Sequence, residues 1–424
     1  MPFDHCDSPQ TLPSDAISTP MSRGLIGVFA CASGLSVANV YYAQPLLDQV
    51  ATDFAISPAA VGGVMTATQV GSVLALLFIV PLGDQMDRRY LMLMQMQIVA
   101  LIGGLFCVGL THSPALMLLS MLVIGLMGTA MTQGLIAYAA TACLTQERGR
   151  VVGTVQGGVV IGLLLSRVTA GLIADVAGWR WVYLGASLVM MALALILCKT
   201  LVPQRPASAP MAFPKLLASM FTLLKHDRIL QIRGMLALFI FAALSIFWSA
   251  LVFLLTHPPY SFSHTTIGTF GLVGVVGALA AARAGVLADR GLGQWTTGVS
   301  LVLLMLAWLM LWLTPYSIAW LVIGVVILDL GAQAIHVTNQ SMIFSARPGS
   351  HSRVVGCYML FYAVGSGLGA LASTSLYAMY GWTGVCVLGG GVSLAALFFW
   401  GLTLRCMPAV HKNSIQWAVR GTTR

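Results

Sequence analysis

Four polar side chains recur along one apolar segment, residues 318–340, where charged residues are rare. Asp329 is followed by Gln333, His336 and Gln340, at four, seven and eleven residues further along the chain. At about 100° per residue, these positions share one face of an α-helix. A carboxyl group and an imidazole in an apolar setting can both take up and release a proton during a reaction cycle. We interpret the stripe as a candidate proton pathway; the alternative is a fixed hydrogen-bonded cluster that stiffens the helix.

The composition of the chain indicates a membrane protein. Of its 424 residues, 58% are hydrophobic and only 8% are charged, whereas soluble domains hold roughly a quarter charged residues. This composition excludes a cytosolic enzyme, a nucleic-acid-binding protein and a disordered chain. The eight cysteines are scattered without a CxxC pair, so we expect neither a disulfide framework nor a metal site.

Twelve apolar runs are long enough to cross a bilayer, which takes about 20 residues of helix. The runs are continuous and do not alternate, which favours helices over β-barrel strands, and a helix satisfies its own backbone hydrogen bonds in lipid. We therefore predict an all-α membrane protein with twelve transmembrane helices. The predicted spans are 24–46, 58–80, 91–110, 115–137, 151–173, 182–201, 234–256, 265–287, 295–313, 318–340, 354–377 and 384–404.

The distribution of Lys and Arg predicts the orientation. If the N-terminus is cytoplasmic, 18 of the 21 Lys and Arg residues lie in cytoplasmic segments and only Arg180 lies outside, as the positive-inside rule requires. The other two, Arg167 and Arg283, lie within spans. The net charge of +9 is then a topology signal, and no nucleic-acid partner is needed to explain it. We predict a plasma membrane protein, in a bacterium the inner membrane, with both termini cytoplasmic.

The two sides of the chain are similar in sequence. Residues 150–179 align with residues 353–382 at an offset of 203 without a gap. Because six spans separate the two copies, both start on the same side of the membrane, which predicts two parallel six-helix repeats. The coinciding residues are Arg150/Arg353, Gly153/Gly356, Gly162/Gly365, Gly178/Gly381 and Trp179/Trp382.

The spans and the charges divide the chain into five predicted parts. The long connection between spans 6 and 7 has apolar residues at helical spacing beside basic ones, which predicts an amphipathic helix on the inner membrane face. The alternative is a short extension of span 7. The predicted parts are a cytoplasmic tail (1–23), a six-helix bundle (24–201), a cytoplasmic linker with the amphipathic helix (202–233), a second bundle (234–404) and a cytoplasmic tail (405–424).

Two loops carry a shared motif. Residues 80–89 read VPLGDQMDRR and residues 285–293 read GVLADRGLG, which aligns Asp84 with Asp289. With twelve spans in two repeats, the chain resembles a major facilitator superfamily transporter, whose loop between helices 2 and 3 has a pattern like GxLADRxGRR. The resemblance implies alternating access between two bundles, with these loops as latches that stabilise one conformation. Simple positive-inside loops are the alternative. The residues of the predicted latches are Asp84, Arg88, Arg89, Asp289 and Arg290.

Span 5 resembles the drug:proton antiporter branch of that family, which has the pattern GxxxxxxxxGxxxGPxxGG in this helix. Gly153, Gly162 and Gly171 match the pattern, whereas Arg167 stands where the pattern has proline. The resemblance implies close packing at these glycines and export in exchange for protons. Ordinary packing of small residues is the alternative explanation.

In facilitator folds, helices 1, 4, 7 and 10 line a central cavity, so the resemblance places the Asp329 stripe there. Arg167, deep in span 5, could bind an anionic substrate, neutralise Asp175 or extend its head group toward the membrane surface. The residues predicted for the substrate and proton pathway are Asp329, Gln333, His336, Gln340, Gln133, Thr129, Asn39, Tyr42, Gln69 and Arg167.

The leading hypothesis is a secondary transporter that works by alternating access and exports a small organic molecule in a proton-coupled reaction. An importer or facilitator of a small metabolite is the alternative in the same class, and a transport-like membrane sensor is the alternative from another class. The sequence shows no nucleophile–base set, HExxH motif or P-loop, so we expect no enzyme activity, no metal and no cofactor. The expected partners are a small-molecule substrate, protons and the lipid bilayer, and we expect a monomer.

Overall fold

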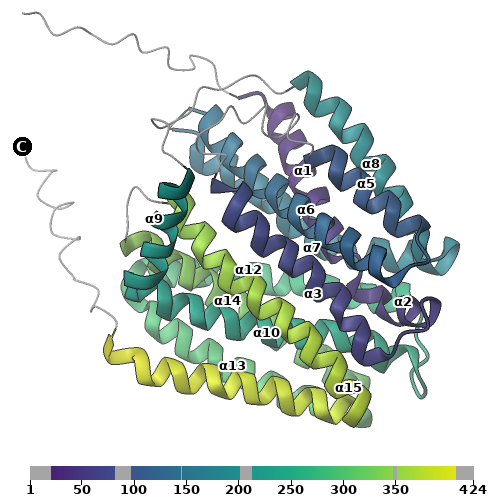
Figure 1. The fold of residues 1–424 in the computed structure, drawn as a ribbon. Coiled ribbons are helices and arrows are strands. Elements are labelled where there is room, and N and C mark those ends of the chain that lie inside the picture. Colours follow the sequence, from purple (N-terminus) through teal and green to yellow (C-terminus); the bar gives the residue numbers. More distant parts are fainter. Residues whose placement is uncertain (1–20, 82–96, 145, 201–212, 347–350, 407–424) are drawn as a thin grey trace, which may run out of the picture.

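The computed structural model describes residues 21–81, 97–144, 146–200, 213–346 and 351–406, which fold into helices joined by short loops, with no strand among them (Figure 1). The first part of the chain, here called the N-terminal half, contains α1 (Arg23–Tyr41), η1 (Gln44–Leu46), α2 (Leu47–Asp53), α3 (Pro58–Leu74), η2 (Ala75–Ile79), α5 (Gln97–Leu110), α6 (Pro114–Ala142), α7 (Arg148–Ala177) and α8 (Trp179–Thr200).

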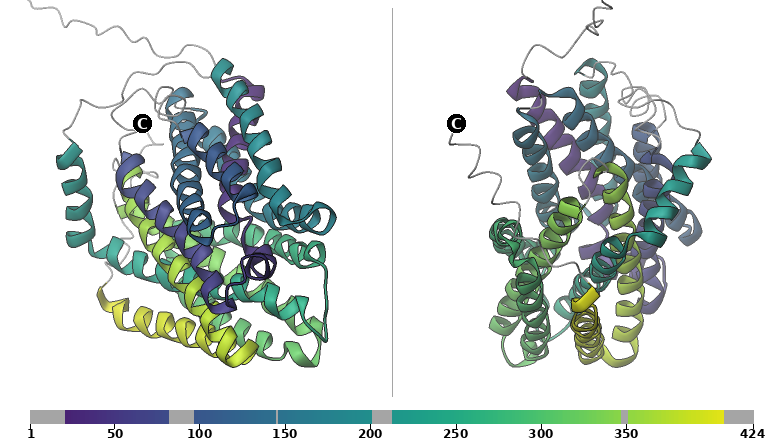
Figure 2. Two further views of the ribbon diagram at one scale, coloured as in Figure 1. Left: turned by 45° about the vertical axis from the view of Figure 1, so that its right-hand side comes forward. Right: turned by 90° about the vertical axis from the view of Figure 1, so that its left-hand side faces the viewer.

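The second part, here called the C-terminal half, begins with a short helix outside the second bundle. Its elements are α9 (Phe213–His226), α10 (Arg228–Thr256), α11 (His264–Thr269), η4 (Phe270–Val273), α12 (Gly274–Leu287), η5 (Ala288–Leu292), α13 (Gly293–Trp312), η6 (Thr314–Tyr316), α14 (Ile318–Ala346), α15 (His351–Thr403) and η7 (Leu404–Cys406). The two views of Figure 2 show the helices that follow α9 gathered into a second bundle beside the first.

Described helices fall in all twelve predicted spans, but they are divided differently. Among the described residues, nine helices are long and apolar enough to cross a membrane. The predicted span 91–110 begins before the described part of α5, and the predicted span 265–287 is interrupted by the 3₁₀ turn η4 between α11 and α12. The last two predicted spans form the single element α15, in which Gly381 has a non-helical backbone.

The sequence repeat has a backbone counterpart where each bundle turns into its last helix. Gly178 and Gly381, which align at the offset of 203, have φ angles of +91° and +60°. Side chains other than hydrogen are strained in this region, so glycine fits the turn. The tryptophans that follow, Trp179 and Trp382, are both buried. The same turn therefore ends the fifth helix of each half.

Close helix crossings depend on glycines at equivalent places in the two halves. In the N-terminal half, a Cβ on Gly162 of α7 would collide with the backbone of Gly34 on α1. In the C-terminal half, a Cβ on Gly365 of α15 would collide with the backbone of Leu238 on α10. Small residues let membrane helices approach until their backbones touch, so these crossings fix the distance between helices within each bundle.

The halves meet through α3 and α15 and through α7 and α11. The Thr66 hydroxyl donates to the Gly367 carbonyl at 2.9 Å, and the Thr374 hydroxyl donates to the Ala59 carbonyl at 3.3 Å. The end of the bundle that holds residues 257–263 is here called the loop face. The opposite end, which holds α9, is called the α9 face. At the loop face the halves touch, because a Cβ on Gly171 of α7 would collide with the backbone of His264 on α11.

The predicted amphipathic helix is present as α9, and its apolar side packs on protein. Met220 is buried against Cys357 of α15, whose thiol donates to the Met220 carbonyl at 3.8 Å. Asp227 separates α9 from α10 because its extended backbone breaks the helix and its carboxylate caps α10. The seventh span begins at Arg228, earlier than the predicted start of span 234–256. As a result Arg233, assigned above to the linker, lies fully buried in the bundle.

The glycine crossing between α1 and α7 gives a stability prediction. Gly162→Ala inserts a methyl group where the Gly34 backbone lies, and overpacking of this kind costs about 1–3 kcal/mol. We expect a lower apparent melting temperature in thermal unfolding of the detergent-solubilised protein.

Gly153→Ala is the matched control, because a Cβ at Gly153 meets nothing within 4 Å and alanine favours the helix by roughly 1 kcal/mol. Equal melting temperatures for the two variants would contradict the packing argument.

Candidate functional site

Asp329 is buried in the middle of α14, with 7% of its surface exposed. Two glycines of the eighth span make room for it: a Cβ added to Gly274 would stand 3.1 Å from Asp329 Oδ2, and one added to Gly277 would stand 3.3 Å from Asp329 Cβ. Trp248 of α10 lies close to the carboxyl group. Three helices of the C-terminal half therefore surround this acid.

Arg167 of α7 reaches the same tryptophan from the N-terminal half. Its guanidinium carbon lies 3.9 Å from the centroid of the Trp248 ring, a cation–π contact. The Nε and Nη2 groups donate to Gln44 Oε1 at 3.2 and 3.0 Å. Arg167 is buried, and its charge interacts with that of Asp329. A cation and an acid from opposite halves thus both lie next to Trp248.

A small cavity of about 10 Å³ lies beside the guanidinium, which is room for about one water molecule. Its walls come from both halves and combine one cation and one amide with apolar and aromatic surface. These walls offer a cation, an amide and apolar surface to a polar group, but the closed cavity is much smaller than a ligand pocket. The lining residues are Gln44, Pro45, Arg167, Trp248, Leu251, Val252 and Ile267.

The structure separates the members of the Asp329 stripe. His336 Nδ1 lies 2.9 Å from the Tyr358 hydroxyl, and its ring meets Phe241 edge-on at 5.1 Å between centroids. Those neighbours belong to α15 and α10, away from Trp248. Gln333 and Gln340 are half-buried on α14. The stripe therefore passes through two different environments, although its members share one side of the helix.

The predicted pathway residues of the N-terminal half occupy several interfaces. Asn39 and Gln69 are buried, as is Tyr42, whose ring meets Tyr183 edge-on at 6.5 Å. The Thr129 hydroxyl donates to the Ser72 hydroxyl at 2.8 Å, which joins α6 to α3. Gln133 is half-buried on α6. Thr129 therefore contributes to packing within this half.

The predicted latch loops are described only in part. Asp84, Arg88 and Arg89 lie outside the described residues. Asp289 and Arg290 belong to η5, where Gly291 has a φ angle of +84°, and Arg290 is exposed. The latch role stays a prediction.

The three glycines singled out in span 5 differ in their surroundings. Gly162 contacts α1, as described above, whereas a Cβ on Gly171 would collide with the backbone of His264 on α11 in the other half. Gly153 has open space around it. Two of the three positions thus mark close helix contacts, and one of these contacts joins the two halves.

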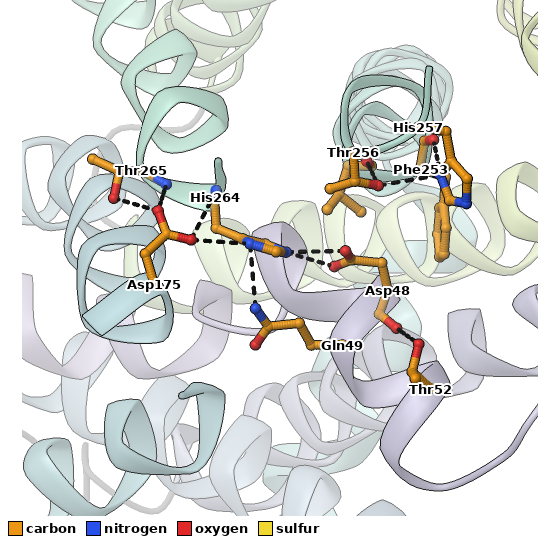
Figure 3. Close-up of polar contacts among 10 residues, drawn as sticks. Asp48, Gln49, Thr52, Asp175, Phe253, Thr256, His257, His264 and Thr265 are labelled. Carbon is orange, nitrogen blue, oxygen red and sulfur yellow. Dashed lines mark hydrogen bonds and ion pairs between the residues drawn. The ribbon is translucent and has the colours of Figure 1, made fainter. Parts of the chain in front are cut away.

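A cluster at the loop face was not anticipated from the sequence (Figure 3). His264, the first residue of α11, lies between two carboxylates of the N-terminal half. Its Nε2 atom is 3.0 Å from both oxygens of Asp48, and its Nδ1 atom is 3.2 Å from Asp175 Oδ1. Asp175 therefore pairs with His264 and not with Arg167, one of the partners considered above. The available signal was the position of all three residues just beyond predicted spans.

A second charged group on the loop face lies within the N-terminal half. Arg180 pairs with Asp53 and donates to the Thr111 carbonyl at 2.8 Å. Trp179 Nε1 also donates to Asp53, at 2.9 Å. These contacts join α8 to α2 and to the end of α5, and they do not cross to the other half.

The comparisons with known proteins agree with the helical membrane fold. The sequence profile of the Major Facilitator Superfamily matches residues 28–351 and 285–422, and the chain belongs to this family. It is 40% identical over 380 residues to the uncharacterized transporter YgaY of Escherichia coli O157:H7, covering 90% of this chain and 95% of that relative. It is 21% identical over 403 residues to the uncharacterized MFS-type transporter YybF of Bacillus subtilis (strain 168), covering 93% and 97%.

Solved structures show the same fold. A bacterial homologue of the human lysosomal transporter Spinster, in an inward-facing and occupied conformation, superposes with a TM-score of 0.75 at 16% identity, covering 92% of this chain and 98% of that chain. A point mutant of the nucleoside transporter NupG gives a TM-score of 0.71 at 15% identity, covering 89% and 99%. The predicted fold class is confirmed: the protein is an all-helical membrane protein of the major facilitator fold.

Family membership also confirms the broad function. The protein is a secondary transporter with a small-molecule substrate and is not an enzyme. It is integral to a membrane, and its bacterial relatives indicate the plasma membrane. The antiporter-like branch, the direction of transport and the orientation of the termini stay predictions.

The charge pair around Trp248 gives a prediction on stability. Arg167→Gln leaves Asp329 without its cation, and Asp329→Asn leaves Arg167 without its anion. Removal of one partner of a buried pair is costlier than removal of both, so the double variant should be more stable than the sum of the single effects implies, by about 0.5–3 kcal/mol. Denaturant unfolding of all four proteins in detergent measures this coupling.

Arg167→Gln combined with Gln340→Ala is the control pair, and its effects should add. Strict additivity of Arg167→Gln and Asp329→Asn would show that the two charges do not interact.

Proposed function

We propose that this transporter is proton-coupled, that Asp329 binds the proton and that Arg167 binds the substrate. The observation that carries the proposal is the arrangement around Trp248, where the acid of α14 and the cation of α7 come from opposite halves. An ionisable residue inside a membrane bundle is costly unless it has a function or a partner. Here each charge stabilises the other, and the proposed movement of the halves separates the two.

Protonation of Asp329 changes what Arg167 can bind. When Asp329 is ionised, its negative charge balances the guanidinium, and a substrate anion would add a second negative charge to a buried site. When Asp329 is protonated, the guanidinium is available to an anionic group, with Trp248 and the apolar walls of the cavity for the rest of the molecule. The charges of the site therefore suit a substrate with an anionic group, such as a carboxylate, accompanied by one proton.

The balance of charge at the site determines which direction of substrate transport it favours. An anion that binds with the proton moves with it, which gives uptake into the cell when the outside is more acidic. This is the importer considered from the sequence. Export in exchange for protons is the second candidate, favoured by the close contacts at Gly162 and Gly171 of α7, which agree with the antiporter-like pattern. Export requires a neutral or cationic substrate that competes with the proton for Asp329.

The orientation predicted from Lys and Arg makes the α9 face cytoplasmic and the loop face external. With that orientation, the described structure is closed toward the outside. The proposed exchange of substrate and proton with the cytoplasm then takes place through the α9 face.

Vesicles that contain the purified protein and an internal pH dye test the proposal. Short-chain and aromatic carboxylates, their amides and the matching amines are added outside, and protein-free vesicles correct for passive permeation. Transport of an anion with a proton acidifies the interior, whereas inward movement of an amine or amide in exchange for a proton makes it alkaline.

Asp329→Asn should abolish the transport-linked pH change, because an amide carries no proton at this position. Val322→Ala, at an exposed position of the same helix, should retain it. Proton movement that persists unchanged in Asp329→Asn would remove Asp329 from the mechanism.

A further inference from the structure

The geometry points to a second proton-binding site of the transport cycle: we infer that His264 with Asp48 and Asp175 is a gate that holds the loop face closed while His264 is protonated. The inference concerns the movement of the halves and does not depend on which substrate or proton carrier occupies the centre. It starts from an imidazole of one half inserted between two carboxylates of the other.

The number of N–H groups on the imidazole decides which protonation state of His264 fits between the two carboxylates. A neutral imidazole has one N–H group, whereas the cation has two. Both ring nitrogens face carboxylate oxygens, at 3.0 Å for Asp48 and 3.2 Å for Asp175. Only the protonated ring can donate to both acids at once. Protonated His264 therefore forms two charge-assisted hydrogen bonds between the halves.

The neutral ring has a weaker alternative in the same place. Gln49 Nε2 lies 3.2 Å from His264 Nδ1 and can donate to that nitrogen when it carries no proton. The bond to Asp175 is then lost, while Asp48 still accepts from Nε2. Asp175 keeps its bonds from the backbone N–H groups of His264 and Thr265, at 3.1 and 2.7 Å. The gate thus has two hydrogen-bonding arrangements. Protonation of His264 favours the one in which the two halves attract each other more strongly.

The local charges raise the affinity for this proton. His264 precedes the predicted span 265–287. Burial by itself lowers the pKa of the imidazole, but hydrogen bonds and charge from Asp48 of α2 and from Asp175 of α7 outweigh it, so the pKa is raised above its ordinary value. Separation of the halves removes both acids. The closed state is therefore stabilised below a pH of about 6.5, and this stabilisation is lost as the pH rises through the raised pKa.

The gate shares its two helices with the central site. On α11, His264 lies one turn before Gly268, and a Cβ on Gly268 would collide with the Arg167 carbonyl on α7. On α7, Arg167 lies about two turns before Asp175. Withdrawal of α11 from α7 at the gate therefore also removes the backbone that packs against Arg167. A proton bound at the loop face can in this way change the contacts around the central cation.

A distance measurement across the loop face tests the inference. Spin labels are placed on Val176 of α7 and Tyr316 of η6, which are 80% and 82% exposed, in an otherwise cysteine-free full-length protein in lipid nanodiscs. The label-to-label distance distribution is measured between acidic and alkaline pH without substrate. We expect the short-distance population to dominate at acidic pH and to decrease as the pH rises.

The variants separate the gate from other titrating groups. His264→Gln should give a distribution that does not change with pH. Asp48→Asn should lower the midpoint of the change by about one pH unit, and it keeps the imidazole in place if His264→Gln fails to fold. His257→Gln is the matched control, because His257 bonds the Phe253 carbonyl of its own helix, and it should retain the wild-type profile.

Two results would overturn the inference: a wild-type profile in His264→Gln and Asp48→Asn, or a loop face that closes as the pH rises. The proposed function fails separately. If Asp329→Asn still moves protons while the distances follow His264, the central assignment is wrong and the gate stands.

Discussion

The account depends on one constraint: a buried cation and a buried acid, held by opposite halves of the bundle, cannot both be separated and remain charged without a large cost. Arg167 and Asp329 satisfy this constraint beside Trp248, whose ring face contacts the guanidinium and which also lies close to the carboxyl group. A protein that must move its halves apart has to neutralise one of these charges or replace its partner. In the mechanism proposed above, a proton does the first and a substrate anion does the second.

The rest of the fold serves to bring these groups together in one conformation. Glycine crossings such as Gly34 with Gly162 fix the helices within a half, and Gly171 and Gly268 allow α7 and α11 to meet backbone to backbone across the halves. The loop-face cluster around His264 lies on the same two helices. The central charge pair and the gate are thus placed on shared elements, and a movement at one of them changes the contacts at the other.

Much of the fold could be predicted from the sequence, because membrane spans are set by local apolar length and the repeat by local residue types. Asp329 and Arg167 could be found in the same way, since charge inside an apolar segment is conspicuous. Trp248 and His264 could not, because their roles come from contacts between segments far apart in the chain. Helical periodicity places Asp329 and His336 on one face of α14. The helix packs against different neighbours at these two positions, and periodicity carries no information on those neighbours.

The central claim is that Asp329 gains and loses a proton at the pH values found on the two sides of a cell membrane. Infrared difference spectroscopy of the protein in lipid tests it most directly, by following the C=O stretching band of a protonated carboxyl group as the pH is lowered. The account predicts a band that appears in the wild type and is absent from Asp329→Asn, and that changes in Arg167→Gln because the nearby cation is gone. An identical carboxyl band in the wild type and in Asp329→Asn would contradict it.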